Sequence, residues 1–304
     1  MRNFFIFLLI IIIYKVSAQK YIIVDNLKFA TKKYTLDTKQ LYNIDSKIIL
    51  YNIFIDDKIL LFSILPSNIN EITHTNYEKL SKNIGKAVKE NSIEKDMNWK
   101  KVEFKDIKDN IVSISDVLDN ITSEWGVEIT PEKKTFEYKL AKKDGDDYYI
   151  TNNCLTEFFS IANSQYPIIA PYGTINISES KVTIKQMQES FKKQYPKSIF
   201  PLDVFGKSQS RGGDGIYTVR NYLSKGYKVK KDNAYQFWTL DSWWNIHGDN
   251  HHRGIDRFVY IPEKGIVGGS YDFYFRDPRG FRIADTVLWQ NIINEKVMIA
   301  EELK

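Results

Sequence analysis

The sequence predicts an α+β protein, and two kinds of local pattern support this class. Runs rich in β-branched and aromatic residues, separated by short polar turns, are typical of strands in hairpins. Segments that open on a threonine with Glu or Gln three residues later, followed by apolar residues at helical spacing, are typical of capped helices. We expect an N-terminal sheet with a packed helix, and a C-terminal antiparallel β-meander with flanking helices.

The first 18 residues predict a secretory signal peptide. A short basic start, Met1 to Asn3, precedes the uncharged run from Phe4 to Tyr14. Val16 and Ala18 fit the small-x-small pattern before a cleavage site, so we expect cleavage after Ala18. An uncleaved anchor is the alternative, but a helix of this length rises about 17 Å against a hydrocarbon core of about 30 Å. We therefore expect an exported protein, periplasmic or secreted.

Composition limits the classes of partner. The chain carries a formal net charge of +5, and its lysines alternate with acids, which is typical of a solvated surface. Because no Lys/Arg tract is dense, we expect no nucleic-acid partner. After residue 18 no stretch is apolar for long enough to span a membrane, so we expect no further span. The single cysteine, Cys154, has no partner for a disulfide within the chain, so stability must come from the core.

The region 19–130 predicts the N-terminal sheet. Residues 47–55 and 58–65 are two β-branched runs on either side of Asp56-Asp57, which indicates a hairpin. Both runs are almost continuously hydrophobic, which is typical of strands covered on both faces.

The helix that we expect to pack on this sheet begins at Thr75. Glu78 stands three residues later and completes a capping box. One apolar stripe then continues at helical spacing through Tyr77, Leu80, Ile84 and Val88. Residues 107–124 are less regular and are interpreted as a strand followed by a short helix.

A polar, proline-containing break at 131–134 predicts a boundary, so 131–304 is taken as a C-terminal α+β domain. It opens with a hairpin around Lys142 to Asp147. A helix capped by Thr183 and Gln186 follows and ends before Pro196.

The last third of the chain predicts the antiparallel meander. Its strands are expected at 234–246, 255–261 and 266–276, and a C-terminal helix is expected at 283–303. Alternation in the third strand places Asp272, Tyr274 and Arg276 on one face, and Tyr271, Phe273 and Phe275 on the other.

Three of the four histidines lie in the loop that joins the first two of these strands. Imidazole and carboxylate groups this close suit zinc or another divalent ion, and they are His247, Asp249, His251 and His252. The alternative is a solvated hairpin loop that contains histidine.

Cys154 follows a polar segment and precedes an apolar one, which predicts a place in the first turn of a helix. Amide dipoles there lower a thiol pKa and favour the thiolate nucleophile. Papain-like cysteine hydrolases use such a layout with a histidine from a later sheet, and His247 is the candidate here. The alternative is a small buried side chain.

The aromatic strand predicts a binding surface. Trp238 and Trp244 share one face, and an exposed ring beside Asp241, Asp272 and Arg276 suits a sugar or a protein partner. The alternative is that both faces of this strand are core.

Two functional classes remain open. We favour a non-enzymatic protein that binds another macromolecule of the envelope or extracellular space, with no cofactor, because neither catalytic set is complete. The alternative is an exported hydrolase that uses Cys154 with His247, or a metal such as zinc held by the histidine cluster.

Overall fold

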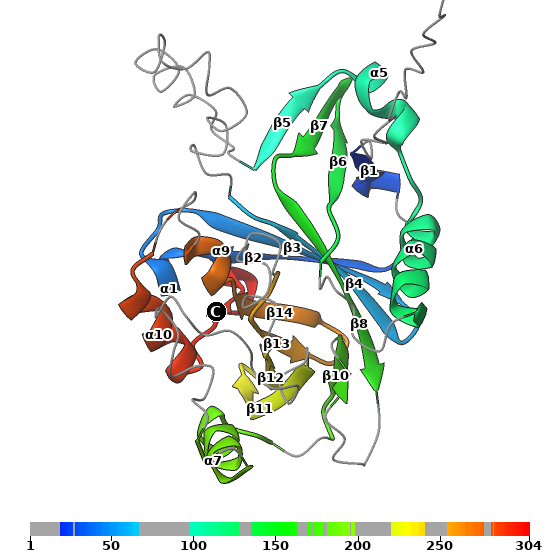
Figure 1. The fold of residues 1–304 in the computed structure, drawn as a ribbon. Helices are drawn as coiled ribbons and strands as arrows, with labels where there is room; N and C mark the ends of the chain where they lie inside the picture. The colour runs from blue at the N-terminus through cyan, green and yellow to red at the C-terminus, as the bar shows by residue number, and fades with distance from the viewer. Residues whose placement is uncertain are drawn as a thin grey trace, which may run out of the picture.

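The residues that the structure describes form a mixed fold of three β-sheets together with helices (Figure 1). This computed structural model describes residues 19–26, 28–66, 98–127, 135–162, 170–171, 173–178, 181–194, 196–197, 220–240, 254–276, 281 and 283–304. The predicted helix at 75–88 and the predicted boundary at 131–134 lie outside these residues.

A five-stranded sheet, called the central sheet, occupies the middle of the fold. Its order is β10-β8-β4-β3-β2, with strands β2 (Thr31–Asp37), β3 (Lys47–Ile55), β4 (Lys58–Ile64), β8 (Cys154–Ala162) and β10 (Thr174–Asn176). All pairs are antiparallel except β10 with β8. The predicted hairpin β3–β4 is confirmed, and Asp56 adopts a left-handed φ of 51° in its two-residue turn.

One face of the central sheet packs against a six-stranded sheet, called the meander sheet. Its order is β15-β14-β13-β12-β11-β9, with strands β9 (Ala170–Pro171), β11 (Arg220–Val229), β12 (Asp232–Leu240), β13 (Arg257–Ile261), β14 (Gly265–Ser270) and β15 (Met298–Ile299). Phe258 meets Phe159 edge to face at 5.1 Å and stacks on Phe237 at 5.1 Å. The predicted antiparallel meander is present from β12 to β14, and β11, which the sequence patterns did not predict, pairs antiparallel with β12.

The other face of the central sheet is covered by helix α6 (Ile114–Val127) and a four-stranded sheet, called the outlying sheet. Its order is β1-β6-β7-β5, with strands β1 (Lys20–Ile23), β5 (Trp99–Val102), β6 (Tyr138–Asp144) and β7 (Asp147–Thr151). Val117 and Ile121 of α6 share one cluster with Leu60 and Phe62 of β4. The prediction that β3 and β4 are covered on both faces is confirmed.

The two regions expected on either side of 131–134 share these sheets. Strand β1 pairs with β6 in parallel, and β4 pairs with β8 antiparallel. The predicted hairpin of β6 and β7 is present, with Gly145 at a φ of 61° in its turn.

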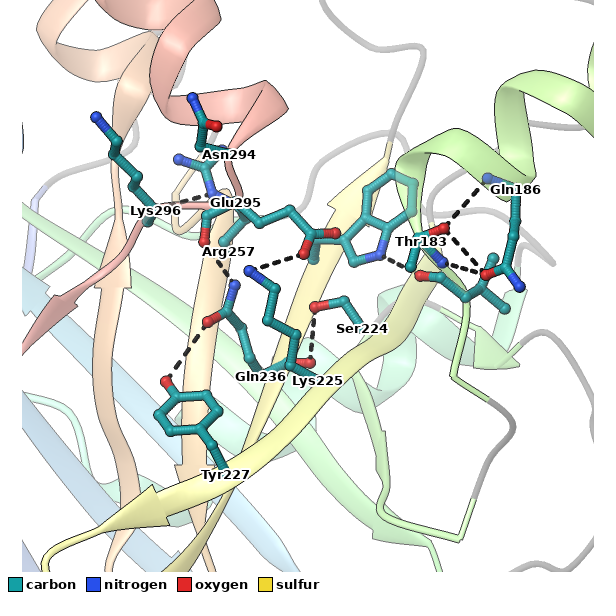
Figure 2. A network of polar contacts seen from close by, with 12 residues as sticks. Thr183, Gln186, Ser224, Lys225, Tyr227, Gln236, Arg257, Asn294, Glu295 and Lys296 are labelled. Atoms are coloured by element: carbon teal, nitrogen blue, oxygen red, sulfur yellow. Dashed lines mark hydrogen bonds and ion pairs between the residues drawn. The ribbon is translucent and has the colours of Figure 1, made fainter.

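The remaining helices are short and lie at the sheet ends: α1 (Lys39–Tyr42), η1 (Val24–Asn26), α5 (Phe104–Ile107), η3 (Lys108–Asn110), α7 (Ile184–Gln194), α9 (Asp272–Arg276), α10 (Asp285–Ile293) and η5 (Glu301–Leu303). The predicted capping box of α7 is confirmed. The Thr183 amide donates to Gln186 Oε1 at 2.8 Å, and the Gln186 amide donates to Thr183 Oγ1 at 3.2 Å (Figure 2). The strand expected within 107–124 is wrong, because α5, η3 and α6 occupy that segment.

Two expectations for the C-terminal part are corrected. The third meander strand ends at Ser270, because Asp256 Oδ2 accepts the Phe273 amide at 3.3 Å and caps a helical turn, α9. The final helix ends at Ile293, and Glu295 then adopts a left-handed φ of 49°. The chain returns as β15 beside β14.

A buried asparagine joins the central sheet to the meander sheet. Asn52 Oδ1 accepts the Ile266 amide at 2.7 Å, and Asn52 Nδ2 donates to the Ile266 carbonyl at 2.9 Å. Gly265, at a φ of 82°, allows this approach, since an added Cβ would stand 2.6 Å from Asn52 Oδ1. Glu157 makes a second junction by accepting the Ile255 amide at 2.9 Å.

Asn52→Ala is expected to lower the free energy of unfolding by at least about 2 kcal/mol. The variant leaves the Ile266 amide and carbonyl buried, and each unsatisfied group costs about 1–3 kcal/mol. Urea unfolding measures the change. Asn110→Ala, in the surface turn η3, is the control and should shift stability by less than about 0.5 kcal/mol. Equal effects of the two variants would contradict the assigned role of Asn52.

Candidate binding surface

Trp238, expected on an exposed aromatic platform, is buried in the structure. The residue is 3% exposed, and its indole Nε1 donates to the Val182 carbonyl at 3.2 Å. The neighbouring Gln236 donates through Nε2 to the Glu295 carbonyl at 2.7 Å. The expected exposure of Trp238 is therefore wrong, because the segment before α7 covers its indole and the turn after α10 covers this face of β12. A ligand would have to displace the Val182 segment to reach the ring.

The rest of this network ties the turn after α10 to the meander sheet. Lys225 Nζ lies 2.9 Å from Glu295 Oε2, and Arg257 Nε donates to the Lys296 carbonyl at 3.0 Å (Figure 2). Tyr227 contributes its hydroxyl to Gln236 Oε1 at 3.4 Å. These contacts join backbone and side chains of the same chain, so we interpret the network as structural.

Asp272 and Arg276, expected on a strand face, lie in α9 instead. Asp272 is fully buried, and its Oδ2 is 2.6 Å from Nη2 of Arg257, a residue that the sequence patterns did not single out. Burial raises the pKa of Asp272, and the Arg257 guanidinium opposes that rise. The nearby Asp256 carboxylate raises the same pKa. Asp272 is thus half of a buried ion pair rather than part of an open surface.

Cys154 is the first residue of β8, so the predicted place in a helical first turn is wrong. It pairs with Ile64 of β4. This long-range pairing holds the segment in an extended strand conformation, although its sequence resembles a helix start. Burial raises the pKa of the Cys154 thiol to about 12, so the thiol is protonated at neutral pH. The environment expected to activate this nucleophile is absent at Cys154.

The other predicted site residues lie outside the part of the chain that the structure describes: Asp241, Trp244, His247, Asp249, His251 and His252. The histidine metal site and the pairing of Cys154 with His247 therefore stay predictions. Within the described residues, no group of three or more His, Cys, Asp or Glu side chains is arranged to hold a metal ion.

The outlying sheet carries lysines and aromatic rings that the sequence patterns did not connect. Across three strands, Lys142, Tyr149 and Lys101 stand opposite one another on one face, and Lys143 stands opposite Tyr148 on the other. We call this set the lysine–aromatic surface, and it covers both faces of the projecting strands. Lys101, Lys142, Tyr149 and the buried Trp99 lie on one face, and Lys100, Phe104, Lys143 and Tyr148 lie on the other. This surface stands at one end of the molecule, where β5, β6 and β7 extend past the central sheet (Figure 1).

Its rings hold the lysines in place. Lys142 Nζ lies 4.5 Å from the centre of the Trp99 ring and 5.6 Å from that of Tyr149. On the opposite face, the Tyr148 ring stacks on Phe104 at 4.7 Å, and Phe104 is 42% exposed. Large exposed aromatic side chains of this kind are enriched at interfaces.

Three of the four lysines on this surface are not neutralised by the described residues. Lys101 forms an ion pair with Asp147 at 2.6 Å, and the hydrogen bond raises its pKa. Both side chains of that pair are exposed, so its strength is small. The ammonium groups of Lys100, Lys142 and Lys143 form no ion pair within the described parts of the chain, although the Asp25 carboxylate accepts the Lys143 backbone amide at 2.6 Å. The sequence evidence for the lysine–aromatic surface is weak, because recognising the surface requires knowing that β5 and β7 are neighbours.

Comparisons with known proteins give no relative. No protein-family model matches the chain, and neither the curated proteins nor the solved structures contain a match. Among the described helices, none is both long enough and apolar enough to cross a membrane. The function must therefore be argued from the chain itself.

Arg257→Met is expected to lower the free energy of unfolding at pH 7 by about 3–5 kcal/mol, because it leaves the Asp272 carboxylate buried without its cation. It also raises the folded-state pKa of Asp272 further. A carboxyl whose pKa is higher in the folded than in the unfolded protein contributes its full stability at pH values below the unfolded pKa. That contribution is lost as the pH rises through the folded pKa. The loss should therefore be smaller at pH 4 than at pH 7.

Urea unfolding of Arg257→Met at the two pH values measures this difference. Adding Asp272→Asn should remove most of the pH dependence that Arg257→Met introduces, since no titrating group then remains at that position. A loss of equal size at both pH values would contradict the assigned pairing.

Cys154 is expected to react with Ellman's reagent far more slowly in the folded protein than in urea at pH 8. A thiol pKa of about 12 lowers the thiolate fraction by about three orders of magnitude, and burial blocks access. Rapid reaction of the folded protein would show that the thiol is exposed and activated.

Proposed function

We propose that this chain is a non-enzymatic binding protein of the cell envelope or extracellular space, and that it holds an anionic macromolecule on the lysine–aromatic surface. One observation carries the proposal. The ammonium groups of Lys100 and Lys143 on one face of the outlying sheet, and of Lys142 on the other, form no ion pair among the described residues and lie in a sheet rich in aromatic rings.

The electrostatics favour an anionic partner. Lysines gathered on one element attract polyanions over a distance of about 10 Å at moderate salt. Strands β5, β6 and β7 carry five lysines, Lys100, Lys101, Lys139, Lys142 and Lys143, and two acids, Asp144 and Asp147. These strands are net positive, while the acids Asp25, Glu103 and Asp146 lie beside them.

The aromatic rings add contact area at small entropic cost. Tyr148 is held between Phe104, stacked at 4.7 Å, and Lys143, whose Nζ is 5.9 Å from the ring centre. Such side chains are ordered before a ligand arrives, so binding costs less side-chain entropy. A lysine that lies on an exposed ring gains only about 0.5–1 kcal/mol, so an anionic group competes readily for it.

The hydrolase alternative receives no support from the described residues. Cys154 is buried with a raised thiol pKa, and the histidine cluster lies in a segment that the structure leaves undescribed. Binding is the function that the observed chemistry favours.

The triple variant Lys100→Glu, Lys142→Glu and Lys143→Glu is expected to lose retention on an immobilised sulfated polysaccharide, used as a generic polyanion. The measurement is the salt concentration at which residues 19–304 elute. We expect the wild-type chain to elute later than the variant, because three cationic contacts become repulsive.

The matched control is Lys39→Glu, Lys193→Glu and Lys197→Glu, three exposed lysines away from the surface. Both triple variants change the net charge equally, so a shift specific to the first isolates the surface from overall charge. Equal shifts in the two variants would overturn the proposal. Circular dichroism checks that both variants are folded.

A further inference from the structure

A hollow of ≈ 470 Å³ lies between β1, the loop residues Lys28 and Phe29, and the start of α6. Its volume falls in the range of about 300–1,000 Å³ typical of small-molecule sites. The apolar side chains that line it are Ile22, Ile23, Phe29, Ile111, Val112 and Ile114. This hollow is on β1 and α6, apart from the lysines of β5 and β6 described above.

The apolar lining is incompletely covered. Ile22 and Ile114 are buried, while Ile23, Phe29 and Val112 are only half-buried. Half-buried apolar side chains that converge on one hollow gain free energy when an apolar ligand removes them from water.

The walls of the hollow are joined by backbone pairing. The Val112 amide donates to the Tyr21 carbonyl at 2.9 Å, and Ile111 forms a parallel bridge with Tyr21. Because β1 also pairs with β6 over four residues, the site is ordered before any ligand enters.

Among the described residues, the lining of the hollow carries one charged side chain, that of Lys28, and the Asp116 carboxylate is hydrogen-bonded to the lining residue Ser113. Lys28 is exposed and has no carboxylate partner in the described chain. The N-terminus of α6 is capped within the chain, since the Ser113 amide and Oγ donate to Asp116 Oδ2 at 3.0 and 2.8 Å and the Asp116 amide donates to Ser113 Oγ at 3.1 Å. The amine of Lys28 is therefore the group left to pair with a ligand.

We infer that this hollow binds a small amphiphile with an apolar body and an anionic head, of the class of a medium-chain carboxylate. The apolar body lies against Phe29, Ile111 and Val112, and the head pairs with Lys28. This site goes beyond the proposed polyanion binding and does not depend on it.

Isothermal titration of residues 19–304 with octanoate, octyl phosphate and octanol tests the assignment. Saturable 1:1 binding of octanoate, about tenfold tighter than that of octanol, supports it, because a charge pair worth about 1.4 kcal/mol is tenfold in affinity. Octyl phosphate distinguishes a carboxylate head group from a phosphate head group. Binding as tight as that of octanoate supports recognition of an anionic head in general. Much tighter binding of octyl phosphate would overturn the assignment of a carboxylate ligand in favour of a phosphate ligand.

Two variants locate the site. Lys28→Glu should weaken octanoate about tenfold and leave octanol unchanged, whereas the control Lys105→Glu, on α5, should leave both unchanged. Val112→Trp should fill the hollow and abolish binding of both ligands. Equal affinity for octanoate and octanol, binding that does not saturate, or octanoate binding unaffected by Lys28→Glu would overturn the inference. The Lys28→Glu result remains interpretable even if Val112→Trp unfolds the protein, because Lys28 is exposed and its replacement disturbs no packing.

Discussion

The whole fold depends on the burial of both faces of the central hairpin. Every residue of β4 from Ile59 to Ile64 is inaccessible to solvent, so neither face tolerates water. One face requires the meander sheet, and the other requires α6 and the outlying sheet. Because β3 and β4 contain few polar groups, Asn52 is conspicuous, and its two hydrogen bonds to Ile266 fix which part of the meander lies above the hairpin.

Local signals in the sequence predicted the parts of the fold that local interactions decide. The hairpin turn at Asp56 and the capping box at Thr183 are formed by residues within a few positions of each other. Cys154 was misplaced because a polar segment before an apolar run resembles a helix start, and pairing with β4 overrides that preference. Likewise, Asp256 stabilises the turn at Phe273 from 17 residues away.

The difference between local and long-range interactions also explains which candidate site residues the sequence revealed. Trp238 and Asp272 attracted interest for their composition, yet burial makes them anchors of the meander sheet. The lysine–aromatic surface was missed because it joins Lys101 to Tyr149 and Lys142 through cross-strand register, which one sequence does not reveal. The polar groups of the core thus specify the fold, while the proposed polyanion contacts are exposed lysines of the outlying sheet.

The pairing of distant segments has a kinetic consequence. Asn52 and Ile266 are 214 residues apart, and β15, near the end of the chain, closes one edge of the meander sheet. Loop closure over such distances is entropically costly, and chains dominated by long-range strand pairing fold slowly. The face of the hairpin β3–β4 that packs on the meander sheet therefore stays exposed until the C-terminal strands have been synthesised, so the nascent chain is prone to aggregate unless a chaperone covers it.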